Sequence, residues 1–427
     1  MPSYSIPLSG LDANAQALQI ISNNLANINT VGYKTSTADF ADLFYSRLGT
    51  SGAGNPMQQG TGTQIASVST NFTEGPVNSD GVSSHVAIQG DGFFVLQKDG
   101  GQIYSRAGNF SVDTNGNLVS ADGAQVLGYP TVNGAVNTNA APGSLMMGSG
   151  RIIPAHATSE FGLTMNLDAS AASGASFSTP ITVYDSLGGA HTLTATYTKS
   201  ATADQWSYSI TLPQSDLTPP SGGATAASNV LATGTLNFNT DGTVSTASPI
   251  ALSMSAGGGG QAPATLNDGA ANLSLNWNLK DSAGNSLVTQ TAGTSSVAAN
   301  SQDGYASGSL QGFNIQNDGK IVGTFSNSQT GVIGQLALAT FSNEQGLSRI
   351  GANDYSATPG SGLPNIGVPG SGGRGLVQGA STEGSNVDIA SQFAQLIQAQ
   401  RGYEANAKAV TTVDQMTQDA FNMKAGL

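Results

Sequence analysis

Apolar residues follow a helical spacing at both ends of the chain and an alternating spacing between them. Near the N-terminus, Leu11, Leu18 and Leu25 recur every seven residues, with Ile21 and Ile28 offset by three. The C-terminal series with the same step is Ile389, Leu396, Tyr403 and Val410, joined by Phe393, Ala407, Val413 and Ala420. A seven-residue apolar repeat is typical of helices that pair as a coiled coil. The pattern therefore predicts one helix at each end of the chain, each with a narrow apolar stripe.

Each predicted helix has a candidate start signal. Residues 9–12 and 385–388 both have the Ser-x-x-Asp form of a capping box, which predicts that the two helices begin there. An isolated helix with a narrow apolar stripe is only marginally stable in water. We therefore expect each terminal helix to pack against the other or against a neighbouring molecule, as in a protein that assembles.

Between the ends, the apolar spacing changes to two. Three alternating phrases run into a Gly-containing pair, namely Asn115-Gly116 (between Phe110, Val112 and Leu118), Asp241-Gly242 (between Leu236, Phe238 and Val244) and Asp318-Gly319 (between Phe313, Ile315 and Ile321). Such pairs supply the positive φ angles of a primed two-residue turn, so each phrase predicts a β-hairpin. Thr-rich alternating segments at 181–184 and 193–197 add further strands. The middle of the chain is therefore β-rich.

These patterns predict a nested organisation. The fold class is mainly β with α-helical termini: paired N- and C-terminal coiled-coil helices, a discontinuous β domain, and a second β domain inserted into it. The expected parts are a helical domain (1–30 and 385–427), a connector (31–75), an inner β domain (76–150 and 307–384) and an outer inserted β domain (151–306). Insertion is tolerated because the chain ends of a domain usually lie close together at its surface. Within the connector, residues 49–62 are rich in Gly, Asn, Pro and Gln, which predicts a loop.

Composition excludes several classes of function. Charged residues make up 9% of the chain, the net charge is -13, and Lys and Arg are scattered singly, which argues against nucleic-acid binding. No cysteine is present, so thiolate chemistry and disulfides are absent. No apolar run is long enough to span a membrane, and no Sec-type signal precedes the first helix. We expect a cytosolic protein or one exported by a route that needs no such signal.

No arrangement of residues indicates catalysis or a cofactor. His85, His156 and His191 are isolated from one another and from acidic pairs in the sequence, which argues against a metal site. Residues 113–117 resemble a calcium loop, but they lack its acidic phase and closing Glu, so a hairpin turn is the better interpretation. The sequence predicts no enzyme, no cofactor and no metal.

Several long strings resemble the bacterial flagellar axial proteins, the rod and hook family. These are LQIISNNLANINTVGYK at 18–34, DGFFVL at 91–96, YSRAGNF at 104–110, SNVD at 385–388 and QRGYEANAK at 400–408. They cover both ends and the flanking β segments. Residues 181–197 resemble the outer domain of the hook branch, and the chain is longer than rod subunits, which lack this insertion.

The resemblance implies a structural subunit of the flagellar hook. It would be exported unfolded by the flagellar type III apparatus and self-assemble outside the cell into a curved tube that joins rod to filament and transmits torque as a universal joint. Implied partners are further copies of the chain, the distal rod protein, the hook cap, the hook-filament junction proteins, the hook-length control protein and the export apparatus. No nucleic acid and no membrane insertion are expected. The alternatives are another axial subunit, distal rod or hook-associated, and a secreted β-rich glycan-binding protein with exposed aromatics. Trp206 and Trp277 lie on alternating stretches that favour core packing instead.

We predict that the terminal helices line the tube and make the contacts between subunits. The predicted interface residues are Leu11, Leu18, Ile21, Asn24, Leu25, Ile28, Ile389, Phe393, Leu396, Arg401, Tyr403, Val410 and Val413. Asn23, Asn24, Asn27 and Asn29 are poor helix formers, which favours hydrogen bonds that fix register over a frayed helix end.

Other polar residues near the predicted interface have two interpretations each. Arg401 and Glu404 either pair between subunits or form an exposed intrahelical pair. Tyr33 and Lys34 either contact a neighbour or anchor the connector, and Arg106 either holds an adjacent copy or packs within its own domain.

Overall fold

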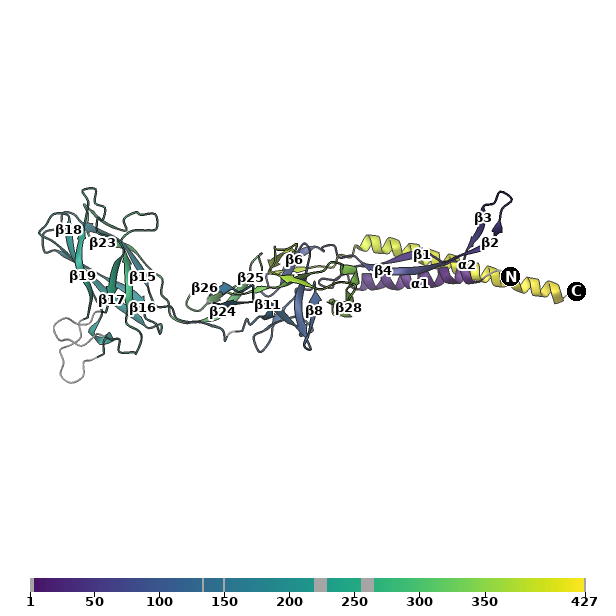
Figure 1. Cartoon of the computed structure of the whole chain (residues 1–427), viewed down its shortest axis with the longest axis horizontal. Helices are drawn as coiled ribbons and strands as arrows, with labels where there is room; N and C mark the ends of the chain where they lie inside the picture. Colours follow the sequence, from purple (N-terminus) through teal and green to yellow (C-terminus); the bar gives the residue numbers. More distant parts are fainter. Residues whose placement is uncertain (1–3, 133, 149, 219–228, 255–264, 426–427) are drawn as a thin grey trace. The chain divides into compact units, whose positions relative to one another are not determined.

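The computed structural model describes residues 4–132, 134–148, 150–218, 229–254 and 265–425. The chain forms two compact units. Unit 1 comprises Met1–Arg151, Gln311–Thr324 and Thr330–Leu427, and unit 2 comprises Ile152–Leu310 and Phe325–Gln329. The predicted fold class, mainly β with one long helix near each terminus, is confirmed (Figure 1). None of the helices described here has the length and apolar character needed to cross a bilayer.

Unit 1 contains both long helices, α1 (Ser5–Ala26) and α2 (Ile389–Ala425). Its strands are β1 (Ser36–Asp42), β2 (Tyr45–Thr50), β3 (Pro56–Gly60), β4 (Thr63–Thr70), β5 (Val77–Ser79), β6 (Val86–Gln89), β7 (Phe93–Lys98), β8 (Gly101–Ser105), β9 (Ser111–Val112), β10 (Leu118–Val119), β11 (Gln125–Val132), β12 (Ala135–Val136), β13 (Gly143–Ser144), β26 (Thr330–Leu336), β27 (Leu338–Thr340), β28 (Ser348–Gly351), β29 (Asp354–Ser356), β30 (Asn365–Gly367), β31 (Leu376–Gly379) and β32 (Ser381–Glu383). Two further strands, β24 (Gly308–Ile315) and β25 (Lys320–Phe325), have residues in both units.

The β part of unit 1 is built from segments far apart in the sequence. Strands β26, β11, β7, β8, β29 and β28 follow one another in its main sheet, and β27 also pairs with β7. Two small antiparallel sheets, β6 with β31 and β5 with β32, bring the segment before α2 beside residues 77–89. Aromatic residues including Phe93, Tyr104 and Tyr355 form the core. The chain therefore returns to its first β segments before α2 begins.

Unit 2 contains two sheets that share one core. Its strands are β14 (Ile152–Ile153), β15 (Glu160–Asp168), β16 (Ser176–Tyr184), β17 (Ala190–Lys199), β18 (Gln205–Thr211), β19 (Val230–Asn237), β20 (Ile250–Ser253), β21 (Ser274–Asn278), β22 (Val288–Thr291) and β23 (Ser296–Gln302). One sheet has the order β16-β17-β18-β19, and the other has β20-β21-β15-β22 with β23 also on β15. Trp206 and Trp277 are both buried in the common core, so their predicted core packing is confirmed.

All three predicted hairpins are present, but the predicted turn type is wrong. In the first, Leu118 pairs with Val112, and the amide of Gly116 donates to the carbonyl of Asp113. Gly116 has a φ of 83°. Asn115 does not have a positive φ, whereas a primed type I turn needs two such residues. Equivalent bonds occur at Gly242 and Gly319, so each hairpin turns through a type I turn followed by a left-handed glycine.

Two further local predictions are corrected. Helix α1 begins at Ser5, so Ser9 lies inside the helix, where its hydroxyl donates to the carbonyl of Ile6. The C-terminal capping box is also shifted, because α2 begins at Ile389 and the carboxylate of Asp388 accepts from the amide of Ala390. Residues 49–62 are not simply a loop. They contain β3 and the end of β2, which form an antiparallel hairpin.

The expected isolation of the histidines from acidic pairs is wrong for His191. His85 Nδ1 lies 2.6 Å from Asp80 Oδ2. His191 has an aspartate at each ring nitrogen, Asp185 and Asp216, at 2.9 Å. The third, His156, stacks on Tyr305. Sequence separation hid the contact of His191 with Asp216, because the fold brings them together from different segments.

Candidate assembly interface

Helices α1 and α2 pack antiparallel through small side chains. The buried residues of α1 are Gly10, Ala13, Ala17, Ile21 and Asn24. Across from them, Ala399 of α2 is buried and packs with Ala17 and Ile21. Spacings of three and four place these α1 residues on one face of the helix. The predicted pairing of apolar stripes is therefore replaced by a close contact between small residues, with Leu18 and Leu396 packed at its edge.

Two glycines and two asparagines make this contact reciprocal. A Cβ on Gly402 would lie 2.7 Å from Asn14 Oδ1, and a Cβ on Gly10 would lie 2.8 Å from Asn406 Nδ2. Each asparagine donates to a carbonyl of its own helix, Asn14 to Gly10 and Asn406 to Gly402. Each amide group thus lies in the gap left by the glycine of the opposite helix. This fixes the register of the helix pair, and the large-residue pattern of the sequence did not reveal it.

Asn24 makes buried hydrogen bonds of the kind that the sequence predicted for the asparagines of this helix. It is 1% exposed, and its Nδ2 donates to the carbonyl of Ser36 and to Gln392 Oε1 of α2. Its Oδ1 accepts from the Tyr33 hydroxyl and the Ser36 amide. A single buried amide therefore joins the end of α1, the start of β1 and the first turn of α2.

The predicted interface residues lie in three environments. Buried within the chain are Ile21 and Asn24; half-buried are Leu11, Leu18, Leu25, Ile28, Leu396, Val410 and Val413; exposed are Ile389, Phe393, Arg401 and Tyr403. Within the described part of the chain, Arg401 and Glu404 form no ion pair. Only the exposed and half-buried members are available to a second molecule without rearrangement.

A row of large apolar side chains remains uncovered on α2. Ile389, Phe393 and Ile397 are spaced by four and are 51%, 46% and 49% exposed, and we call them the α2 stripe. Four-residue spacing places them on one side of the helix. Farther along α2, Met416 and Phe421 are also exposed. A helix normally turns such residues toward a core, so the stripe is a surface that lacks its cover in the single chain.

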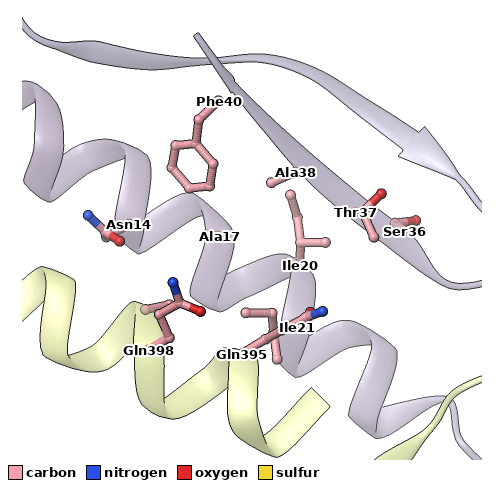
Figure 2. Close-up of a pocket in the computed structure, with 11 residues that line it drawn as sticks. Asn14, Ala17, Ile20, Ile21, Ser36, Thr37, Ala38, Phe40, Gln395 and Gln398 are labelled. Atoms are coloured by element: carbon pink, nitrogen blue, oxygen red, sulfur yellow. The ribbon is translucent and has the colours of Figure 1, made fainter. Parts of the chain in front are cut away.

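A groove runs between α1, α2 and β1. It has a volume of about 220 Å³ and is lined by Asn14, Ala17, Ile20, Ile21, Ser36, Thr37, Ala38, Phe40, Gln395, Gln398 and Ala399. Figure 2 shows Phe40 of β1 lying over the α1 side of this groove. Phe40 is 51% exposed. The groove is thus an apolar and amide-lined recess next to the helix pair.

The hairpin of β2 and β3 is exposed along its whole length. Phe44, just before it, is 91% exposed, and Tyr45, Leu48 and Met57 are also exposed. A two-stranded hairpin is marginally stable alone in water. Its apolar side chains therefore form a second uncovered surface in unit 1.

A buried ionic group holds the connector to the segment before α2. Lys34 Nζ lies 2.6 Å from Glu383 Oε1, and both side chains have 0% exposure. Arg106 Nε lies 3.4 Å from Glu383 Oε2, and its Nη1 donates to the carbonyls of Gly90 and Gly92. Burial lowers the pKa of Lys34, with the Arg106 charge adding to this effect and Glu383 opposing it. We call this set the Lys34 node.

The Lys34 node decides two of the open interpretations. Lys34 and Arg106 are 1% and 3% exposed, and Tyr33 is equally covered, so these side chains act within their own chain. The interpretation as contacts with a neighbour is wrong for all three. Arg349 adds a further internal bond, from its Nη2 to the carbonyl of Lys34.

Comparisons with known proteins cover 99% of the chain. Residues 7–34 match the family described as flagella basal body rod protein, 87–165 the flagellar hook protein FlgE/F/G D1 domain, 153–305 the flagellar basal body protein FlaE D2 domain, and 377–423 the flagellar basal body rod FlgEFG protein C-terminal. The flagellar hook protein FlgE of Salmonella typhimurium is 33% identical over 438 residues, covering 99% of this chain and 100% of that protein. The chain belongs to the flagellar hook protein family.

Two further hook proteins are similar to this chain. The flagellar hook protein FlgE of Treponema pallidum is 33% identical over 463 residues, covering 99% of this chain and 100% of the relative. A crystal structure of Helicobacter pylori flagellar hook protein FlgE2 covers 70% of this chain and 99% of its own, with 15% identity and a TM-score of 0.47. As a member of the hook family, the chain is a structural protein of the flagellar hook and basal body and not an enzyme. It assembles into the axial structure of the flagellum.

Proposed function

We propose that this hook family member polymerises into a curved tube that joins the flagellar rod to the filament and transmits motor torque as a flexible universal joint. The observation that carries the proposal is the uncovered α2 stripe. A helix in a monomer gains nothing from exposing Ile389, Phe393 and Ile397, whereas a second subunit that covers them removes apolar surface from water. Repetition of such a contact between two different patches builds a helical polymer when the rotation does not close.

The proposed division of labour follows the four expected parts of the chain. The terminal helices, 1–30 and 385–427, line the inside of the tube, with the connector (31–75) beside them. The inner β domain (76–150 and 307–384) and the inserted domain (151–306) face outward. Contacts between the outer parts are polar and hydrated, because subunits must slide during each rotation with little change in free energy. A chain with 9% charged residues has few fixed charges that would oppose such sliding.

Export and partners complete the proposal. The subunit leaves the cell unfolded through the flagellar type III apparatus and folds on the growing structure outside the cell. The absence of cysteine suits this route, since no disulfide can trap the unfolded chain. Its proposed partners are other copies, the distal rod protein, the hook cap, the hook-filament junction proteins and the hook-length control protein.

The test is polymerisation of purified full-length protein carrying Phe393→Asp. The expected result is loss of tubes in negative-stain micrographs and a monomer in analytical ultracentrifugation, with an unchanged far-UV spectrum. Ala405→Asp is the matched control, because it adds the same charge to an exposed alanine of α2 about 120° around the helix from Phe393. Normal tubes from Phe393→Asp, or equal loss from the control, would contradict the role of the α2 stripe.

A second test addresses the joint. Deletion of residues 151–306 is expected to preserve export and the inner tube but to change the curvature or stiffness of hooks in cells. Complete loss of export would contradict the inserted, outward-facing role of this segment.

A further inference from the structure

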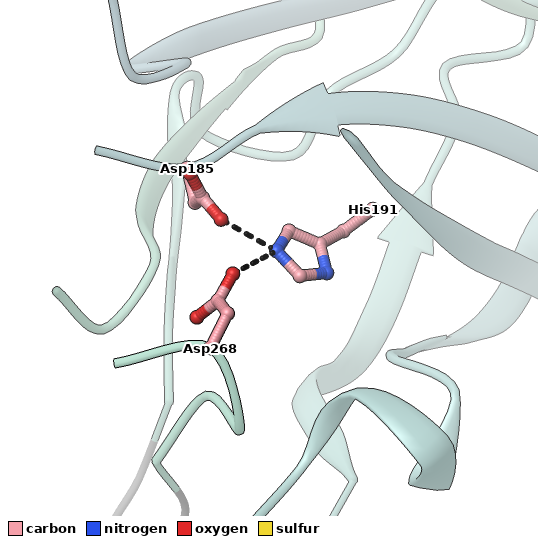
Figure 3. A group of neighbouring side chains, drawn as sticks. All are labelled: Asp185, His191 and Asp268. Atoms are coloured by element: carbon pink, nitrogen blue, oxygen red, sulfur yellow. Dashed lines mark hydrogen bonds and ion pairs between the residues drawn. The ribbon is translucent and has the colours of Figure 1, made fainter. Parts of the chain in front are cut away.

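Unit 2 contains a group of metal-ligating side chains that hook assembly does not use. Asp185 follows β16, His191 lies on β17, and Asp268 comes from the segment before β21. Their ligand atoms all lie within 4.8 Å of one another (Figure 3). The distances from His191 Nε2 are 2.9 Å to Asp185 Oδ2 and 3.7 Å to Asp268 Oδ2. Three separate segments thus present one nitrogen and two oxygens to the same place.

Both carboxylates are held with one oxygen turned toward the imidazole. Asp185 Oδ1 accepts hydrogen bonds from the amides of Leu187 and Gly189, both at 2.8 Å. Asp268 Oδ1 accepts from the amide of Ala270 at 2.9 Å. In each case, Oδ2 is the atom that faces His191 Nε2. The backbone therefore fixes the orientation of the two oxygens before any ligand arrives.

A fourth residue orients the imidazole. Asp216 Oδ2 lies 2.9 Å from His191 Nδ1, on the ring nitrogen that faces away from the other two carboxylates. A carboxylate on the far nitrogen of a ligating histidine fixes its tautomer and increases the basicity of the metal-binding nitrogen. In this arrangement Nδ1 carries the proton and the lone pair of Nε2 faces Asp185 and Asp268.

The charge at this place is unbalanced. Three carboxylates surround one imidazole, so an excess of two negative charges remains even if the ring is protonated. Among the described residues, no Lys or Arg forms an ion pair with Asp185, Asp216 or Asp268. Asp185 is fully buried and His191 is 6% exposed. The Asp216 and Asp268 side chains are 24% and 33% exposed, so water screens part of this excess. The Asp185 charge is fully buried, and such a charge is costly unless it is paired or coordinates a metal.

The space between the two oxygens depends on a glycine. A Cβ on Gly189 would lie 2.5 Å from Asp185 Oδ2 and 3.3 Å from Asp268 Oδ2. Any other residue at this position would therefore press on both candidate ligand atoms. The absence of a side chain here leaves the two oxygens free to share a ligand.

We propose that Asp185, His191 and Asp268 bind one divalent transition-metal ion of the zinc class, with Asp216 as a positioning residue. Zinc bonds of about 2.0–2.2 Å in a tetrahedral site separate two ligand atoms by about 3.3 Å. The two distances to His191 Nε2, 2.9 and 3.7 Å, lie on either side of that value. A water molecule would complete the coordination, because Asp268 is 33% exposed and solvent reaches this side of the site. An imidazole nitrogen favours zinc over calcium, which prefers oxygen ligands.

The bound ion would link the turn after β16 to the segment before β21, two parts of unit 2 that are far apart in the sequence. A proton is the competing occupant of Nε2. Burial disfavours the charged ring, but hydrogen bonds to Asp216 and Asp185 raise the pKa of His191 overall. A metal ion must displace this proton, and the experiment therefore has to distinguish the two occupants.

The experiment uses the full-length chain, stripped with a chelator and dialysed. Titration with Zn²⁺ at pH 7.5 is expected to show one site per chain, and Co²⁺ is expected to give the visible absorption of a tetrahedral site. Asp268→Asn should weaken Zn²⁺ binding at least tenfold. In this variant Zn²⁺ should no longer raise the midpoint of thermal unfolding, followed by tryptophan fluorescence. Because Asp268 is partly exposed, the Asp268→Asn variant is expected to fold. The second variant, Asp216→Asn, should weaken Zn²⁺ binding by about 10–100-fold.

His85→Gln provides the matched control, because His85 has a single carboxylate partner, Asp80, at 2.6 Å. It is expected to leave Zn²⁺ affinity unchanged. Absence of a stoichiometric site in the wild-type chain, equal affinity in Asp268→Asn, or tighter binding of Ca²⁺ than of Zn²⁺ would each overturn the proposal. In the first case the proton is the sole occupant of the site.

Discussion

Replacing Lys34 by Met tests whether the Lys34 node holds unit 1 together. The substitution removes a fully buried ammonium that donates to Glu383 Oε1 and to the carbonyl of Thr73, both at 2.6 Å. It leaves the buried Glu383 carboxylate with Arg106 at 3.4 Å as its nearest cation. Removing one partner of a buried ion pair costs about 3–5 kcal/mol. We expect the lower end, about 3 kcal/mol, because Arg106 remains close to the carboxylate.

The two tryptophans allow the two units to be followed separately. Trp206 and Trp277 both belong to the core of unit 2, whereas α1 and α2 belong to unit 1. In urea, helical circular dichroism therefore reports unit 1 and tryptophan fluorescence reports unit 2. With a slope of about 3 kcal/mol per M, a loss of 3 kcal/mol lowers the midpoint of the helical transition by about 1 M. The fluorescence transition should not move.

The control for this experiment is Lys98→Met. Lys98 also lies 2.6 Å from a carboxylate, Asp122, but the two side chains are 42% and 19% exposed. Such a pair at the surface contributes only about 0–1 kcal/mol, so its removal should barely move the helical transition. Equal shifts for Lys34→Met and Lys98→Met, or a shift confined to the fluorescence transition, would refute the reasoning about burial.

Three further predictions concern single positions. Burial raises the pKa of Asp354 from 3.8 to about 6, so the folded state binds its proton more tightly than the unfolded state, and stability falls as pH rises through 6. Asp354→Asn should therefore stabilise unit 1 by up to about 3 kcal/mol at pH 8 and leave it unchanged near pH 4, as measured by urea unfolding; an equal effect at both values would contradict this. Tyr197 Oη is buried and has no hydrogen-bond partner among the described residues, so Tyr197→Phe should raise the free energy of unfolding of unit 2 by about 1 kcal/mol. A lower free energy of unfolding in the fluorescence transition would contradict this and show that the hydroxyl has a partner such as water. Gly402→Val should lower the free energy of unfolding of unit 1 by about 1–3 kcal/mol, measured by helical circular dichroism, because its side chain meets Asn14. Ala405→Val, at an exposed position, should have little effect on this free energy. An unchanged free energy of unfolding in Gly402→Val would mean that the helices separate easily.

The sequence predicted the kinds of elements well because their periods differ. Seven-residue apolar repeats marked both helices, and alternation into Gly116, Gly242 and Gly319 marked all three hairpins. The turn type was missed because Asn-Gly and Asp-Gly pairs also suit a type I turn followed by a left-handed glycine. The start of α1 was missed because a Ser-x-x-Asp pattern can equally lie inside a helix, as Ser9 does.

Contacts between distant segments could not be derived from the local pattern. His191 and Asp268 lie on different segments of unit 2, and only the path of its strands makes them neighbours. The same is true of Lys34 and Glu383, which stand near opposite ends of the chain. Lysine and arginine usually lie at the surface, so the burial of Lys34 and Arg106 was not the expected outcome from residue type. Their burial is possible because the segment before α2, which carries Glu383, packs against the connector.

The helical repeat in the sequence left out the residues of α2 that contact α1 most closely. One face, with Ala399 and Gly402, is small and already covered by α1. The other, the α2 stripe, carries the larger side chains and is uncovered. A search for large apolar residues selects Ile389 and Phe393 and leaves out Ala399 and Gly402, although only small residues permit the close approach of the helices. Full burial of a large apolar side chain contributes about 1.5–3 kcal/mol. Since about half of each stripe residue is still exposed, covering the three would contribute about 3 kcal/mol per subunit. The internal helix pair is thus complete in the single chain. We propose that the uncovered, large-residue side of α2 supplies part of the driving force for assembly, together with the exposed hairpin of β2 and β3.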